Sequence, residues 1–149
     1  MDKELRDFIL GVIGGVVSTV VGVYAYRSLI AKPYTYLPEP WASATDVITA
    51  SQYLENAIHD KTVEKTYNDL ANVVTQLEHA RAYLLSAYST YKDPTYNTLA
   101  TYTAGLISQV QGFMVQVQTV TDLPSFQSNT LYPFQAQLGY LYYQLERLM

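Results

Sequence analysis

Residues 63–91 read VEKTYNDLANVVTQLEHARAYLLSAYSTY and carry the strongest periodic pattern of the chain beyond residue 32. Two apolar or small series alternate in it at heptad spacing: Val63, Leu70, Leu77, Leu84 and Tyr91, and Thr66, Val73, Ala80 and Ala87. Because no glycine or proline interrupts them, they predict one helix of about 29 residues, roughly 43 Å long, whose seam must pack on partner helices. Tyr67, Val74 and Tyr88 widen the seam, which favours a multi-helix bundle over a two-stranded coiled coil.

The partner helix on the N-terminal side is indicated by apolar or small residues that recur at three- and four-residue steps. They are Ala44, Val47, Ser51, Leu54 and Ile58. This spacing predicts a helix that begins at Pro40 or Ser43, with Ser43 and Asp46 placed like a capping box. Asp60 or Thr62 separates it from the long helix.

Two further helices are predicted on the C-terminal side. Asp93-Pro94 has the residues of a helix start, and an apolar stripe follows from Leu99 to Val120. Gly105 and Gly112 weaken this helix, and residues 114–121 alternate with the period of a strand, so a strand over residues 113–121 stays an alternative. Residues 122–133 are expected to form a loop or short helical turn, and a stripe from Phe134 to Leu148 predicts the final helix.

Residues 8–31 form the other long apolar segment. Phe8 to Tyr26 contains no charged residue, and an α-helix over it covers about 30 Å, the thickness of a bilayer's hydrocarbon core. The fold class predicted is therefore all-α, an N-terminal transmembrane helix followed by an up-and-down bundle of about four helices. The expected organisation is a short flank at residues 1–7, an uncleaved anchor at 8–31, a Pro/Tyr spacer at 32–40 and the bundle at 41–149.

Small residues recur inside the predicted anchor at helical spacing. Gly11 and Gly15 form a GxxxG pair, and Gly14, Ser18 and Gly22 form a ladder beside it. Such residues allow two helix backbones to approach closely, so they are candidates for helix packing in the membrane. The alternative is that glycine is simply common in membrane helices.

The orientation of the anchor follows from composition, because basic residues on its two sides balance. Lys3 and Arg6 precede it, and Arg27 and Lys32 follow it. From Pro94 to the C-terminus the only charged residues are Asp122, Glu146 and Arg147, and neutral polar residues replace the rest. Such a surface suits an extracytoplasmic setting or coverage by neighbouring subunits, so we expect the N-terminus inside and the main domain outside.

Composition and motifs argue against several function classes. The chain has 149 residues, a net charge of -4 and no cysteine, so thiolate chemistry is excluded and no basic run favours nucleic acid. Glu55 and His59 lie four residues apart, but nothing supplies the further ligands of a metal site. No phosphate loop, nucleophile elbow or carboxylate pair in an apolar context is found, so we expect no enzyme, cofactor or metal.

The 15 tyrosines are the most unusual feature of the composition. Tyrosine buries a large ring at low entropic cost while its hydroxyl stays hydrogen-bonded, and it is enriched at protein interfaces. The candidate interface residues are Tyr96, Tyr102, Tyr140, Tyr142 and Tyr143. The alternative is that these rings seal the rim of the small bundle.

These features together predict a non-enzymatic, single-pass, membrane-anchored structural or accessory subunit. Its assembly would be a surface filament, a virion or a membrane complex, and its partners the lipid bilayer and other protein subunits, including further copies of itself. The alternative function is an extracytoplasmic sensory or ligand-binding bundle with a pocket between helices.

Overall fold

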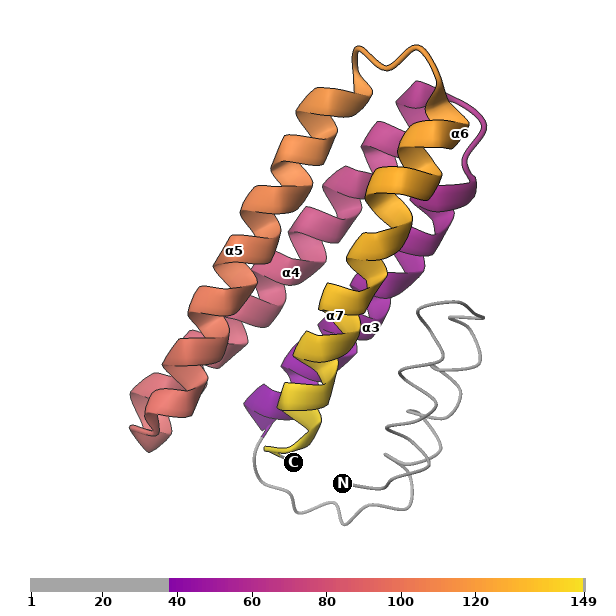
Figure 1. Cartoon of the computed structure of the whole chain (residues 1–149). Coiled ribbons are helices and arrows are strands. Elements are labelled where there is room, and N and C mark those ends of the chain that lie inside the picture. Colours follow the sequence, from indigo (N-terminus) through magenta and orange to yellow (C-terminus); the bar gives the residue numbers. More distant parts are fainter. Residues whose placement is uncertain (1–37, 149) are drawn as a thin grey trace.

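The computed structural model describes residues 38–148, and all regular structure in that range is helical (Figure 1). The four long helices are α3 (Pro38–His59), α4 (Val63–Tyr91), α5 (Pro94–Val117) and α7 (Tyr132–Glu146). A short helix, α6 (Leu123–Phe126), and a π-helical turn, η1 (Gln127–Leu131), connect α5 to α7. Successive long helices run in opposite directions and α7 returns beside α3, so the predicted up-and-down bundle is confirmed. The predicted transmembrane helix lies outside the described residues.

The long helix α4 has the predicted length, and the middle of the predicted seam is buried, but Tyr88 and Tyr91 of that seam are 38% and 40% exposed near the end of the helix. Its buried residues are Thr66, Leu70, Val73, Val74, Leu77, Ala80, Leu84 and Ala87. Thr62 caps its start, where the Lys65 N–H donates to Thr62 Oγ1 at 3.1 Å. Lys92 ends it in a left-handed conformation with φ 62°, and its N–H donates to the Tyr88 carbonyl at 2.9 Å.

The start of α3 differs from the prediction. The helix begins at Pro38, so the last residues of the predicted spacer are helical. Proline is tolerated in a first turn, where its missing N–H would have no partner in the helix. Ser43 is not the cap. It is fully buried, and its Oγ donates to the Ala80 carbonyl of α4 at 3.0 Å, so it joins α3 closely to α4.

The strand alternative for residues 113–121 does not occur. Asp93 caps α5 by accepting from the Thr95 N–H at 2.9 Å, and the helix continues to Val117 before a turn. Packing explains this outcome, because Val110 and Val117 share one helix face and are both fully buried. Alternation of β-branched residues is a weaker determinant than that burial.

Of the two forms expected for residues 122–133, a loop or a short helical turn, the helical one occurs and is longer than expected. Asp122 caps α6 by accepting from the Ser125 N–H at 3.2 Å, and helical structure then continues into α7. Pro133 is accommodated because it follows the π-helical turn, in which the Tyr132 N–H bonds to the Gln127 carbonyl five residues earlier. A wider turn there avoids the clash and the lost hydrogen bond that proline causes inside an α-helix.

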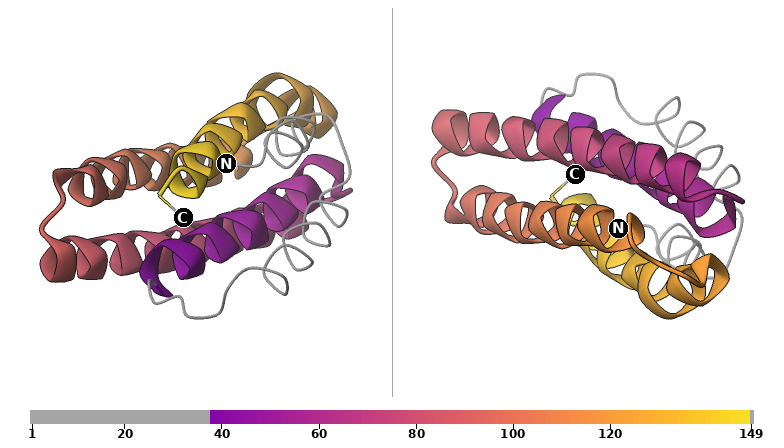
Figure 2. Two further views of the ribbon diagram at one scale, coloured as in Figure 1. Left: turned by 90° about the horizontal axis from the view of Figure 1, so that it is seen from below. Right: turned by 90° about the horizontal axis from the view of Figure 1, so that it is seen from above.

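The helices form two layers around one core. Figure 2 shows α3 and α4 on one side and α5, α6 and α7 on the other. Large side chains with almost no exposed surface line the space between the layers: Leu54, Leu70, Leu77, Leu84, Leu106, Leu131, Phe134, Leu138, Leu141, Tyr142 and Leu145. The core therefore runs along the bundle axis, as the four predicted stripes require.

Candidate functional site

Charge divides the surface of the bundle along the same two layers. The neutral half is defined as residues 94–145, which form α5, α6, η1 and all but the last residue of α7, and its one charged residue is Asp122. The charged half, α3 and α4, holds Asp46, Glu55, Asp60, Lys61, Glu64, Lys65, Asp69, Glu78 and Arg81 between residues 41 and 91. The candidate interface predicted from the tyrosines lies on the neutral half.

Three side-chain pairs join α5 to α7 on this half. The Phe113 and Phe134 rings meet edge to face with centroids 5.3 Å apart. Gln109 and Gln137 exchange amide hydrogen bonds of 3.0 and 3.2 Å. The third pair, Tyr102 and Tyr140, has ring centroids 5.4 Å apart, and burial together with Tyr140 raises the pKa of the Tyr102 hydroxyl. The seam is held by rings and amides, with no ion pair among these contacts.

A tyrosine ridge runs along this seam; we use the name for Tyr102, Tyr132, Tyr140 and Tyr143. The last three share one side of α7, because their spacings bring them to neighbouring positions around a helix. Tyr132 is 43% exposed and Tyr140 is 50% exposed, whereas Tyr102 and Tyr143 are half-buried. The guanidinium of Arg147 lies 5.9 Å from the Tyr143 ring centroid. The ridge is therefore an aromatic surface with one cation, Arg147, against its Tyr143 end.

Two of the predicted interface residues do not belong to any exposed surface. Tyr96 is 6% exposed and Tyr142 is 2% exposed. Tyr96 precedes Leu99 and Thr103 on the buried face of α5, and Tyr142 lies between Leu138 and Leu145 on that of α7. Both rings pack in the chain's own core, so the prediction that they form an interface is corrected, and the alternative of internal packing applies to them.

Glu55 and His59 do meet on one helix face, but their contacts are with neighbouring side chains. Glu55 Oε1 lies 3.0 Å from His59 Nε2, and Gln135 Nε2 donates to Glu55 Oε2 at 2.6 Å. Both carboxylate oxygens of Glu55 thus join groups of α3 and α7. In the part of the chain that the structure describes, no group of three or more His, Cys, Asp or Glu residues could hold a metal ion.

A carboxyl pair that the sequence did not reveal lies where α3 turns into α4. Asp69 is hydrogen-bonded to Asp60, and burial with this like-charged neighbour raises the pKa of Asp69 to about 7. Buried Gln127 of η1 meets the same turn, since its Nε2 donates to the carbonyls of Ala57 at 2.8 Å and Asp60 at 2.7 Å. This amide joins the neutral half to the end of α3.

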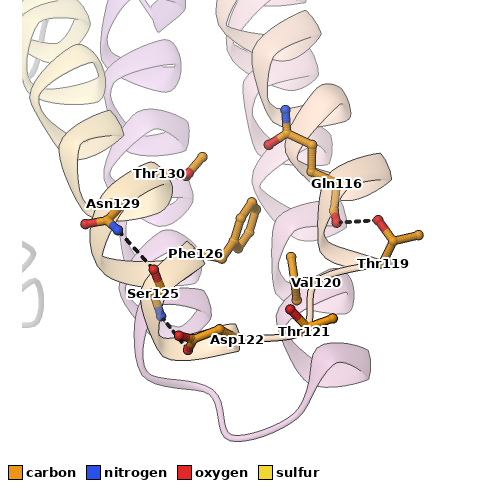
Figure 3. A pocket seen from close by; sticks show the side chains of 9 residues that line it. All are labelled: Gln116, Thr119, Val120, Thr121, Asp122, Ser125, Phe126, Asn129 and Thr130. Carbon is orange, nitrogen blue, oxygen red and sulfur yellow. Dashed lines mark hydrogen bonds between the residues drawn. The ribbon is translucent and has the colours of Figure 1, made fainter.

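A hollow of about 410 Å³ lies between the end of α5 and the α6–η1 segment (Figure 3). It is lined by Gln116, Thr119, Val120, Thr121, Asp122, Ser125, Phe126, Asn129 and Thr130. Most of these side chains are neutral amides or hydroxyls, and Asp122 is the one charged group. The Asp122-x-Pro124 sequence, with its cap and early proline, is the signal that could have placed a helix beside this hollow.

Comparison of the chain with protein-family models, curated proteins and solved structures finds no match. Its function has to be argued from its own residues.

The predicted membrane-packing residues, Gly11, Gly14, Gly15, Ser18 and Gly22, lie outside the described residues. Within residues 38–148, no helix has the length and apolar character needed to cross a bilayer. The anchor therefore stays a prediction from the sequence of residues 8–31.

Proposed function

We propose that this protein is a non-enzymatic, membrane-anchored structural or accessory subunit that assembles with neighbouring subunits through the tyrosine ridge. The assembly is a surface filament, a virion or a membrane complex, and the neighbours include further copies of this chain. The apolar segment at residues 8–31 provides the anchor, with the bundle on the extracytoplasmic side.

The single observation that carries this proposal is the combination of exposed tyrosine and missing charge on the neutral half. Covering a surface with a partner removes charged groups from water at a cost that is repaid only if each is paired well. Tyr132 and Tyr140 can be covered at little of that cost, because α7 has no charged residue before Glu146. Cores of interfaces have this composition, depleted in charge and enriched in tyrosine.

The test is chemical crosslinking of the full-length protein in native membranes, with a charge placed on the ridge. Tyr140→Lys puts an ammonium group in the proposed contact and should abolish the crosslinked species. Tyr83→Lys is the matched control: Tyr83 is similarly exposed, at 44%, but lies on α4 in the charged half. It should leave the crosslinked species unchanged.

Monomer alone at every crosslinker concentration would contradict assembly. Equal loss of crosslinking in both variants would contradict the assignment of the contact to the tyrosine ridge. Protease accessibility of the bundle in intact cells or particles tests the extracytoplasmic placement separately, because a bundle on the inner side stays protected whether or not it assembles.

A further inference from the structure

The hollow at the end of α5 has a lining suited to a neutral, polyhydroxylated ligand. It lies at the opposite end of the bundle from the start of α3 and the end of α7 (Figure 1). Side chains come to it from two separate segments, Gln116 and Thr119 from α5 and its following turn, and Ser125, Asn129 and Thr130 from α6 and η1 (Figure 3). The hollow thus depends on the fold and has no counterpart in a local sequence motif.

Its polar groups can both donate and accept hydrogen bonds. Among the described residues, no hydrogen bond engages the side chains of Gln116, Thr121 or Thr130, so these groups remain available to a ligand. Asn129 Nδ2 donates to Ser125 Oγ at 3.0 Å, which leaves the Asn129 carbonyl oxygen as an acceptor. Val120 is half-buried and Phe126 is 8% exposed, so they add a small apolar surface between these groups.

The lining of the hollow argues against anions, metal ions and wholly apolar ligands. It contains no Lys, Arg or His to hold a phosphate or carboxylate, and Asp122 would repel either. A metal ion would find one carboxylate, whose Oδ1 already accepts from the Ser125 N–H at 3.2 Å. A wholly apolar ligand would leave amides and hydroxyls unpaired, at a cost for each.

The π-helical turn η1 gives this arrangement its shape. Asn129 and Thr130 belong to that turn, and such turns occur frequently at functional sites because they change the direction of side chains relative to a regular α-helix. The turn also holds Gln127 on the carbonyls of Ala57 and Asp60, so the side of the hollow formed by η1 is fixed to α3.

We infer that this hollow binds a neutral saccharide, with amides and hydroxyls on the sugar's hydroxyl groups and Val120 and Phe126 against its C–H face. The hollow, about 410 Å³, is wide open to solvent, so a sugar would bind with one face against the protein and the other in water. A free sugar and the terminal sugar of a glycan share this chemistry. The inference is independent of assembly through the tyrosine ridge, which lies along the α5–α7 seam.

Saturation-transfer NMR on the full-length protein, purified in a detergent whose headgroup contains no sugar, tests the inference. The probes are the methyl glycosides of glucose, galactose, mannose and N-acetylglucosamine, the corresponding trisaccharides, and methyl glucuronide as an anionic comparator. We expect transfer to at least one neutral probe and less to the glucuronide. Transfer to the trisaccharide as well as its monosaccharide identifies a glycan end as the ligand, whereas transfer to the monosaccharide alone identifies a free sugar.

Two substitutions locate the binding. Thr130→Val removes a hydroxyl at nearly constant volume, and Asn129→Ala removes an amide. Each should weaken binding about tenfold, the effect of one hydrogen bond in a binding site. The matched controls on α4, Thr75→Val and Asn72→Ala, change exposed residues of the same types and should leave affinity unchanged.

The inference would be overturned if no neutral probe showed transfer at concentrations on the order of 10 mM, which exceed a millimolar Kd. Unchanged affinity in both the Thr130→Val and Asn129→Ala variants would also overturn it. So would transfer to the glucuronide as strong as transfer to the neutral sugars. Circular dichroism of each variant separates loss of binding from loss of the fold.

Discussion

The charged and neutral halves of the bundle bury apolar side chains to the same extent, but their solvent-exposed surfaces differ in composition. Leu77 in α4 and Leu138 in α7 are both almost completely buried, so the two halves bury their core side chains equally well. Outside, α3 and α4 use carboxylates, lysines and an arginine, whereas α5, α6 and α7 use amides, hydroxyls and tyrosines. The two halves therefore have similar cores but different surfaces, and any difference in their roles lies at the surface.

Contact with other molecules is expected to be least costly on the neutral half. Charged side chains keep a surface hydrated, but removing them from water when a partner binds costs free energy. Neutral amides and tyrosines also keep a surface hydrated, and their desolvation costs less. Both proposed contacts, the tyrosine ridge and the hollow, fall on the neutral half. The charged half contains the two carboxyl groups whose pKa is raised, Asp46 and Asp69.

The largest effect should come from the shared core. Leu77→Ala and Leu138→Ala should each lower the free energy of unfolding by about 2–5 kcal/mol, because each leaves a cavity in a packed interior. Urea or thermal unfolding followed by circular dichroism measures both. A cost for Leu138→Ala far below that of Leu77→Ala would show that the neutral half is more loosely packed than the charged half.

A smaller effect is expected at the joint between the halves. Gln127→Leu removes the donor for the carbonyls of Ala57 and Asp60, which should lower the free energy of unfolding by about 1–3 kcal/mol. Gln109→Ala removes an exposed amide pair of the α5–α7 seam and should cost about 0.5 kcal/mol or less. Equal costs in chemical unfolding would mean that Gln127 does not join the halves.

The pH dependence of stability should arise in the charged half. Because the pKa of Asp69 is raised to about 7 in the folded chain, the folded state binds this proton more tightly than the unfolded state. The resulting stabilisation is complete below the ordinary value of 3.8 and is lost as pH rises through about 7, so Tm should be higher at pH 5 than at pH 8. Burial also raises the pKa of Asp46, which acts in the same direction.

Asp69→Asn should raise Tm at pH 8 and flatten this dependence, whereas Glu78→Gln, at an exposed carboxylate of α4, should not. Scanning calorimetry at both pH values measures the difference. A pH profile that is the same in the wild-type and Asp69→Asn chains would show that the carboxyl pair is not its source.

The smallest effect concerns the two glycines of α5. A methyl group added at Gly105 or Gly112 would meet nothing within 4 Å. Since glycine in a helix interior costs about 1 kcal/mol relative to alanine, Gly105→Ala and Gly112→Ala should each stabilise the bundle by about 0.5–1 kcal/mol. Reduced stability of either variant in urea unfolding would reveal a close contact of α5.

The features that could be predicted from the sequence are those that repeat along it. The heptads of α4 determined its length and its buried face, and Asp93-Pro94 determined the start of α5. The contacts of residues that suit both a local role, such as a helix cap, and a contact with a distant helix could not be predicted. Ser43 has the side chain of a cap, but its hydroxyl reaches Ala80 across the bundle.

The candidate site was less accessible to sequence reasoning for the same reason. Composition located the neutral half and its tyrosines, but exposure separates Tyr140 from Tyr142, and exposure depends on which face of α7 meets the core. The Asp60–Asp69 pair and the hollow bring together residues that are distant in the sequence or belong to different elements. Their positions follow from packing of the helices, which no local pattern encodes.

The π-helical turn at residues 127–131 changes how α6 is rotated about the helix axis relative to α7. Its extra residue rotates everything before it by about 100° relative to α7, compared with an uninterrupted α-helix. Deleting one residue, such as exposed Ser128, would restore regular winding and turn Gln127 away from α3. A single codon therefore sets the direction in which this end of the molecule faces.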